Sequence, residues 1–121
     1  MNKLGVHALV WVGGWSHGEC EAAVSKSAEL GFDYIEIPAL DPASVDTKHT
    51  LMQLEKYGIG ATVSLGLPLD CDISSEDPEV VARGEAMLND ALRLTGEIGA
   101  THMCGILYSG FAKYMQPKTE R

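Results

Sequence analysis

Residues 59–108 read IGATVSLGLPLDCDISSEDPEVVARGEAMLNDALRLTGEIGATHMCGILY, two apolar runs separated by a loop and one long helical pattern. The first run, residues 59–67, is rich in small and β-branched residues and predicts a strand. Asp77 has a proline directly after it, which is typical of the N-cap and first position of a helix. Apolar residues then recur at helical spacing over 78–98, and a glycine follows. Residues 101–108 predict another strand, so the whole stretch predicts the strand–helix–strand unit of a parallel sheet.

The upstream sequence shows the same alternation. An apolar run at about residues 4–11 predicts a strand, and Ser16, three residues before a glutamate, has the spacing of a capping box at the start of a helix. Residues 32–40 predict the second strand. Asp46 is placed to cap the next helix, which Gly58 ends.

The expected order is β–α–β–α–β–α–β, in a single domain of residues 1–121 whose residues 110–121 form a polar tail. Two parallel architectures have this order. In a doubly wound sheet, helices cover both faces. In a (β/α)8 barrel each strand is added beside the last one, and consecutive right-handed crossovers place every helix on one side. A full barrel takes roughly 250 residues, so the second alternative is half of a barrel.

The composition limits the classes of partner. The chain has 121 residues, of which 17 are acidic and 9 basic, and a formal net charge of −8. The basic residues are scattered, so nucleic acid and anionic membrane surfaces are poor partners. The apolar N-terminal run is too short to span a bilayer. Three cysteines without a CxxC pair predict neither a disulfide framework nor a zinc site, and they favour a reduced, cytoplasmic setting.

Five stretches of the chain, taken in order, form a set: MNKLGVHALVW, GFDYIEI, LDPASVD, GLPLDCDISSEDPEVVARG and GILYSG. Together they resemble the N-terminal half of the ketose 3-epimerases, which are the D-tagatose, D-psicose and L-ribulose 3-epimerases of the xylose-isomerase-like barrel superfamily. The resemblance covers nearly all of residues 1–110. It implies an α/β fold of parallel (βα) units in sequential order, half of a (β/α)8 TIM barrel with strands one to four and three intervening helices.

The resemblance also implies a reaction. Members of that family reversibly epimerise a free ketose at C3, with a divalent metal, usually Mn²⁺, holding the substrate and two glutamates exchanging a proton. In the family the metal ligands, including both glutamates, come from strands five to eight. We therefore expect no catalytic residue and no metal ligand in this chain. We expect it to be inactive alone, and to act on a ketose sugar as a homo-oligomer or with a C-terminal half.

This half of the barrel is expected to supply one wall of the sugar pocket. Most of its binding positions follow from the resemblance, at the ends of the strands and in the loops after them. Glu36 is added because a carboxylate inside a barrel must be paired or have a raised pKa. The expected substrate-binding residues are His7, Trp15, Glu36, Ser64, Gly66, Ile106 and Phe111.

Several of these residues also have a purely structural interpretation. His7 lies among apolar residues, as a hydrogen-bonded core histidine does, and Trp15 could be a packing residue below the barrel mouth. Glu36 could orient a loop rather than contact a ligand. His102 and Cys104 alternate on one strand face, but as a metal pair they would need two further ligands. Cys104 is more typical of a small core residue.

Two other functions compete with this interpretation. Two copies of a half-barrel could close an eight-stranded barrel by two-fold symmetry, which would make the chain a non-catalytic, self-associating module. A barrel-type metal-dependent endonuclease belongs to the same superfamily, but the acidic balance of the chain argues against nucleic acid as a substrate.

Overall fold

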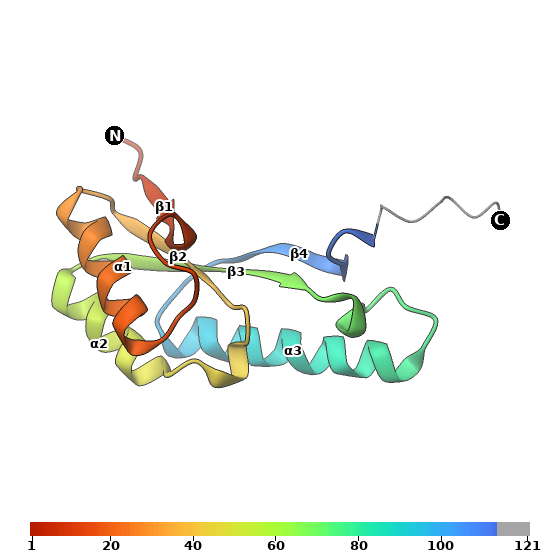
Figure 1. The fold of residues 1–121 in the computed structure, drawn as a ribbon. Helices are drawn as coiled ribbons and strands as arrows, with labels where there is room; N and C mark the ends of the chain where they lie inside the picture. Colours follow the sequence, from red (N-terminus) through yellow and green to blue (C-terminus); the bar gives the residue numbers. More distant parts are fainter. Residues whose placement is uncertain (114–121) are drawn as a thin grey trace.

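The computed structural model describes residues 1–113 and shows strands and helices that alternate along the chain (Figure 1). The predicted tail, residues 110–121, lies outside the described residues from position 114 onward. The elements are β1 (Gly5–His7), α1 (His17–Glu29), β2 (Tyr34–Pro38), α2 (Thr47–Tyr57), β3 (Gly60–Leu67), α3 (Pro78–Glu97) and β4 (Met103–Gly110). Short 3₁₀ turns η1 (Ala8–Val10), η2 (Pro42–Ser44) and η3 (Leu69–Cys71) follow β1, β2 and β3.

The four strands form one parallel sheet in the order β1-β2-β3-β4. Helices α1, α2 and α3 all lie on the same side of this sheet (Figure 1). A doubly wound sheet would carry helices on both faces, so that alternative is wrong. The structure confirms the prediction of sequential parallel (βα) units, the arrangement of half of a (β/α)8 barrel.

The core lies between the sheet and the helices. Along β2 and β3, alternate side chains are buried against α1, α2 and α3, and the intervening ones point to the other face. The burial of these apolar side chains holds the two layers together. The buried apolar residues of the two central strands are Ile35, Ile37, Ala61, Val63, Leu65 and Leu67, and those of the helices are Cys20, Ala23, Val24, Leu54, Ala91 and Leu94.

The predicted helix boundaries are confirmed. Ser16 forms a capping box with Glu19 at the start of α1, and Asp46 accepts a hydrogen bond from a backbone N–H of the first turn of α2. Asp77 caps α3 in the same way. Gly58 ends α2 in the left-handed conformation, with φ of 66°. No helix within residues 1–113 is long and apolar enough to cross a membrane.

The first strand is shorter than the sequence predicts. It ends at His7 instead of continuing to residue 11, and η1 begins at once. The cause is the His7 side chain, whose Nδ1 accepts a hydrogen bond from the Leu9 backbone N–H at 3.1 Å and so caps the turn. A local side-chain bond of this kind competes with strand geometry.

The fourth strand differs from its predicted bounds in the opposite way. It begins at Met103 and runs two residues beyond the predicted end at residue 108. Ile106, which was expected near the end of this strand, therefore lies in its interior. Gly66 pairs with Ile106, but the next pair is Leu67 with Gly110, so residues 107–109 form an irregular excursion before pairing resumes. This displacement carries the end of β4 towards the loop after β3.

A close contact between α3 and η3 gives a stability prediction. A Cβ atom on Gly84 would collide with the Cys71 carbonyl oxygen and lie 2.8 Å from Ile73 Cγ2. We expect Gly84→Ala to lower the free energy of unfolding by about 1–3 kcal/mol, because a backbone atom cannot move aside as a side chain can. Gly96 lies in the same helix with nothing within 4 Å of its Cβ position. Gly96→Ala should therefore raise the stability, by about 0.5–1 kcal/mol. Urea unfolding measures the free energy of unfolding of both variants. Equal changes in the two would show that the close contact at Gly84 does not limit stability.

Candidate functional site

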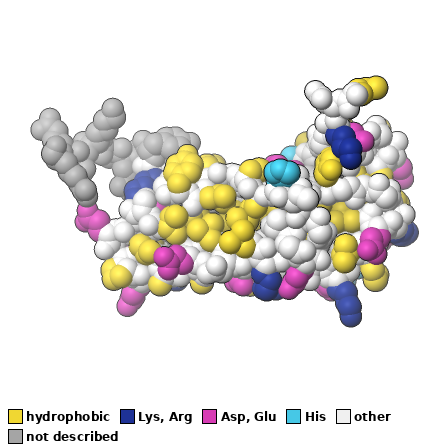
Figure 2. All heavy atoms as spheres, turned by 180° about the vertical axis from the view of Figure 1, so that it is seen from behind, with side chains coloured by type: hydrophobic (Ala, Val, Ile, Leu, Met, Phe, Trp, Pro, Cys, Tyr) yellow, Lys and Arg dark blue, Asp and Glu magenta, His cyan; other side chains and the backbone are white. Residues whose placement is uncertain are grey.

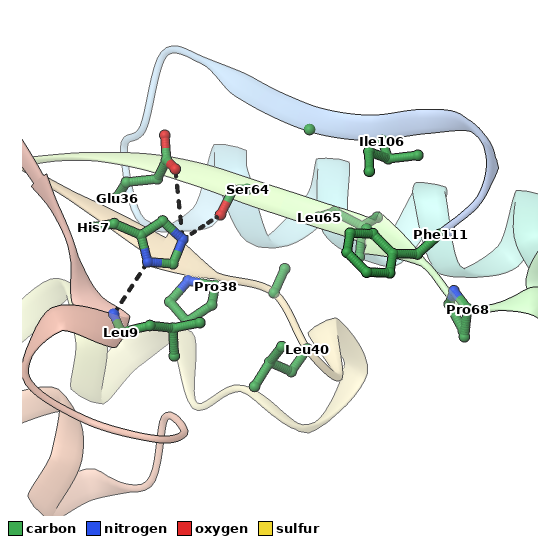
Figure 3. Close-up of a pocket in the computed structure, with 13 residues that line it drawn as sticks. His7, Leu9, Glu36, Pro38, Leu40, Ser64, Leu65, Pro68, Ile106 and Phe111 are labelled. Carbon is green, nitrogen blue, oxygen red and sulfur yellow. Dashed lines mark hydrogen bonds and ion pairs between the residues drawn. The ribbon is translucent and has the colours of Figure 1, made fainter. Parts of the chain in front are cut away.

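A cavity of about 600 Å³ opens at the carboxyl ends of the strands, on the face of the sheet opposite α1, α2 and α3 (Figure 3). Ligand sites of parallel α/β sheets lie at this edge, and their volumes are roughly 300–1,000 Å³. Residues from or just after all four strands line it: His7, Leu9, Glu36, Pro38, Ala39, Leu40, Ser64, Leu65, Gly66, Pro68, Gly105, Ile106 and Phe111.

One end of the cavity is polar. His7 Nε2 lies 3.0 Å from Ser64 Oγ and 3.6 Å from Glu36 Oε1, and the dashed lines of Figure 3 mark both contacts. Because His7 Nδ1 accepts the Leu9 N–H, a neutral ring carries its proton on Nε2 and can donate towards Ser64 or Glu36. The Cys104 thiol donates to the other oxygen of Glu36 at 3.4 Å. We call His7, Glu36, Ser64 and Cys104 the polar row, since it takes one residue from each strand.

The other end of the cavity is apolar. Phe111 comes directly after β4, and its ring lies beside Gly66, where an added Cβ would meet Phe111 Cδ2 at 3.4 Å. Leu40 and Phe111 are 61% and 57% exposed, which leaves large apolar surfaces in contact with solvent. Seen from behind, the molecule has hydrophobic side chains gathered near the middle of that face, with charged side chains mostly towards its edges (Figure 2). The cavity therefore suits a ligand with both polar groups and an apolar face.

Six of the seven predicted site residues line this one cavity: His7, Glu36, Ser64, Gly66, Ile106 and Phe111. Their binding roles stay predictions, but the structure brings them together.

Trp15 does not line the same cavity. Its indole Nε1 donates to Thr50 Oγ1 at 3.1 Å, and the ring packs against the core. Trp15 faces a smaller neighbouring cavity of about 290 Å³, which shares Pro38 and Leu40 with the main one. The surroundings of Trp15 are thus those of a packing residue, as the structural interpretation expected. A role in stacking against a sugar stays a prediction.

Sequence reasoning missed the residues that complete the wall, chiefly Pro38, Leu40 and Pro68. Their position in the sequence could have identified them, because each is the last residue of a strand or lies in the short segment after it. Leu9 was missed for a different reason, since residues 8–10 were assigned to the strand and instead form η1.

Cys104 is exposed, so its interpretation as a small core residue is wrong. It pairs in register with Ser64, which lines the cavity on the face opposite α1, α2 and α3. Desolvation, together with the hydrogen bond and negative charge of Glu36, raises the pKa of the Cys104 thiol. The thiol therefore remains protonated and acts as a hydrogen-bond donor to Glu36.

Within residues 1–113, no group of three or more His, Cys, Asp or Glu side chains is placed to hold a metal ion. His102 turns to Thr101, with its Nδ1 2.7 Å from Thr101 Oγ1. The described residues therefore do not fit a metal centre.

Comparison with known proteins relates the chain to one group of enzymes, although no family model matches it. It is 44% identical over 117 residues to a ketose 3-epimerase of Arthrobacter globiformis, a match that covers 97% of this chain and 40% of that protein. It is 40% identical over 115 residues to an L-ribulose 3-epimerase of Methylomonas sp., covering 95% of this chain and 40% of that protein.

A solved structure gives the same relationship. The crystal structure of a D-allulose 3-epimerase from Methylomonas sp., in complex with D-allulose, matches with a TM-score of 0.92 and 38% identity. That match covers 97% of this chain and 41% of the other. The chain thus spans about two-fifths of the length of the relatives it matches.

The contact between Cys104 and Glu36 predicts a change in thiol reactivity. In Glu36→Gln, the negative charge is gone and the pKa of the Cys104 thiol should fall towards its ordinary value. At pH 7.5 the labelling of Cys104 by uncharged N-ethylmaleimide should then become about two- to fivefold faster, because the thiolate is the reactive form. Peptide mass spectrometry follows each cysteine separately. Cys20 serves as internal control, since burial raises the pKa of its thiol to about 11.

A matched substitution separates this effect from a general change in charge. Glu55→Gln removes one negative charge from the exposed surface of α2 and should leave the Cys104 rate unchanged. An unchanged rate in Glu36→Gln would show that the carboxylate does not act on the thiol.

Proposed function

Because the chain belongs to the ketose 3-epimerase family, over the two-fifths of its relatives' length that it spans, we propose that it builds one wall of the sugar pocket of a ketose 3-epimerase. The observation that carries the proposal is the cavity at the strand ends, with His7, Glu36 and Ser64 of the polar row at one end and Phe111 and Leu40 at the other.

A ketose matches this division of the cavity. Its hydroxyl groups need donors and acceptors, and His7, Glu36 and Ser64 offer both. Its C–H faces need an apolar surface, and aromatic rings serve this purpose in sugar sites. Phe111 supplies the aromatic ring, which lies beside Gly66, where the missing side chain leaves the face of the strand free for the ring. The proposed role of these residues is to bind and orient the sugar.

We assign the proton transfers at C3 to residues outside this part of the chain. Epimerisation requires a proton to leave one face of C3 and return to the other, so general acid–base groups are needed on both faces. Among the described residues that line the cavity, Glu36 is the only carboxylate, and it is already engaged by His7 and Cys104. On this proposal the divalent metal is also held elsewhere in the complete enzyme, and this chain alone does not turn over a ketose.

Sugar binding by the isolated chain tests the proposal. L-ribulose and D-allulose should shift the backbone amide NMR signals of the residues that line the cavity, with dissociation constants on the order of 10 mM, because only one wall is present. Gly66→Leu should weaken binding by about fivefold or more, since the added side chain occupies space next to Phe111. The titration is repeated with Mn²⁺, which should leave the affinity unchanged.

A second glycine provides the control. Gly13 is exposed and has nothing within 4 Å of its Cβ position, so Gly13→Leu should bind both sugars as the unaltered chain does. If neither ketose shifts the signals of the cavity, the proposed pocket is wrong. Turnover of a ketose by this chain with Mn²⁺ would instead contradict the assignment of the proton transfers.

A second candidate is self-association, which is favoured by the uncovered face of the sheet. All three helices lie on the opposite side (Figure 1), and among residues 1–113 strands β1 and β4 are paired on one edge only. Two copies could cover both uncovered faces by two-fold symmetry. Closure would also pair the free edges, which otherwise invite aggregation.

The self-association candidate predicts a particle of twice 13.0 kDa in light scattering. Thr62, in β3, lies on the uncovered face together with residues of β1 and β2. Thr62→Lys would place two positive charges in the interface, one from each copy, and should convert the dimer to a monomer. Ala22→Lys, on the exposed side of α1, should leave the mass unchanged. A monomeric mass for the unaltered chain at millimolar concentration would rule out this candidate.

A further inference from the structure

A polar contact ties the loop after β3 to the end of β4. Lys113 Nζ lies 2.8 Å from Asp72 Oδ2 and 2.7 Å from Ser74 Oγ, and it donates to the Ser74 carbonyl oxygen at 3.1 Å. Asp72 Oδ1 accepts from both the backbone N–H and the hydroxyl of Ser74, at 2.8 Å and 2.7 Å. We call Asp72, Ser74 and Lys113 the clasp.

The clasp is built around a buried carboxylate. The Asp72 side chain is only 6% exposed, whereas that of Lys113 is 39% exposed. A buried carboxylate needs a partner, and here it has one from each side of the contact. The hydrogen bond from Lys113 is the main reason that the pKa of Asp72 lies well below its ordinary value, against the effect of burial.

The residues between β4 and Lys113 have an unusual conformation. Ala112 has φ of 63°, the left-handed region that residues with a Cβ rarely adopt. On its N-terminal side, the Phe111 backbone N–H donates to the Leu67 carbonyl oxygen at 2.6 Å. On its C-terminal side, Lys113 is held by the clasp. A strained residue persists when its neighbours are fixed, and here both neighbours are.

We propose that the Asp72–Lys113 pair is a positioning device for Phe111, which it holds against the cavity by fixing the left-handed turn at Ala112. The Phe111 ring lies beside Gly66, and Figure 3 shows it directed over β3 at the apolar end of the cavity. Without the clasp, Ala112 can relax to an ordinary backbone conformation, and the direction of the Phe111 side chain changes with it. The relevance of this wall to a sugar rests on the proposed function, but the placement of Phe111 does not.

Fluorine NMR of 4-fluorophenylalanine tests the placement directly. The chain contains two phenylalanines, Phe32 and Phe111, so the labelled chain gives two signals, and Phe111→Leu assigns them. Phe32 packs against the core and serves as the internal reference. In Lys113→Met, the Phe111 signal should move at least halfway to its position in the urea-unfolded chain, while the Phe32 signal stays in place. Lys113→Arg keeps the positive charge and should restore the original Phe111 signal.

Further variants separate positioning from general stability. Lys56→Met removes a surface lysine that pairs with Glu21 and should move neither signal. Ser74→Ala weakens the clasp without removing its charges and should move the Phe111 signal alone, by less than Lys113→Met does.

Two results would overturn the proposal. One is an unchanged Phe111 signal in both Lys113→Met and Asp72→Asn. The other is a Phe32 signal that moves as far as that of Phe111 in every variant, including Ser74→Ala, because the clasp would then support the whole fold. No sugar is present in these measurements, so a failure of the proposed sugar binding leaves their outcome unaffected.

Discussion

The structure depends on the burial of one face of a parallel sheet by three helices that all lie on the same side. Ile35, Val63 and Leu67 have no exposed surface because α1, α2 and α3 cover them. In β2 and β3 the side chains in between point the other way, where no described helix lies. Polar side chains on that face stay in contact with water, so they carry no cost of burial. His7, Glu36 and Ser64 can therefore lie next to each other without destabilising the sheet.

The site owes its shape to the ends of the strands and to the turns after them. His7 ends β1 because its own ring caps the next turn, and the same ring offers its other nitrogen to the cavity. The excursion of β4 after Ile106 brings Gly110 beside Leu67, and Phe111 follows at the apolar end. Local backbone irregularities thus position the side chains that a ligand would meet. The regular part of the sheet provides the support.

Much of this fold could be predicted from the sequence, since its signals are local. Asp46 and Asp77 mark helix starts because a capping bond spans only two or three residues. The family resemblance indicated five of the thirteen residues that line the cavity: His7, Ser64, Gly66, Ile106 and Phe111. What could not be predicted depends on contacts between distant residues. The environment of Cys104 follows from its register with β3, and that of Trp15 from a hydrogen bond to Thr50 in α2, 35 residues further along the chain. Neither contact leaves a pattern in the neighbouring sequence.

The contact of α3 with η3 also limits how the length of this chain can vary. At Gly84 the helix backbone approaches the Cys71 carbonyl so closely that no side chain fits between them. The spacing of the two segments is therefore set by main-chain dimensions, and repacking cannot adjust it. The turn that joins them contains exposed residues such as Ser74 and Glu76, but Asp72 is fixed at its start. Natural insertions and deletions in relatives should therefore fall after Ser74, and a residue gained or lost between Cys71 and Ser74 would change the registration of α3 with η3.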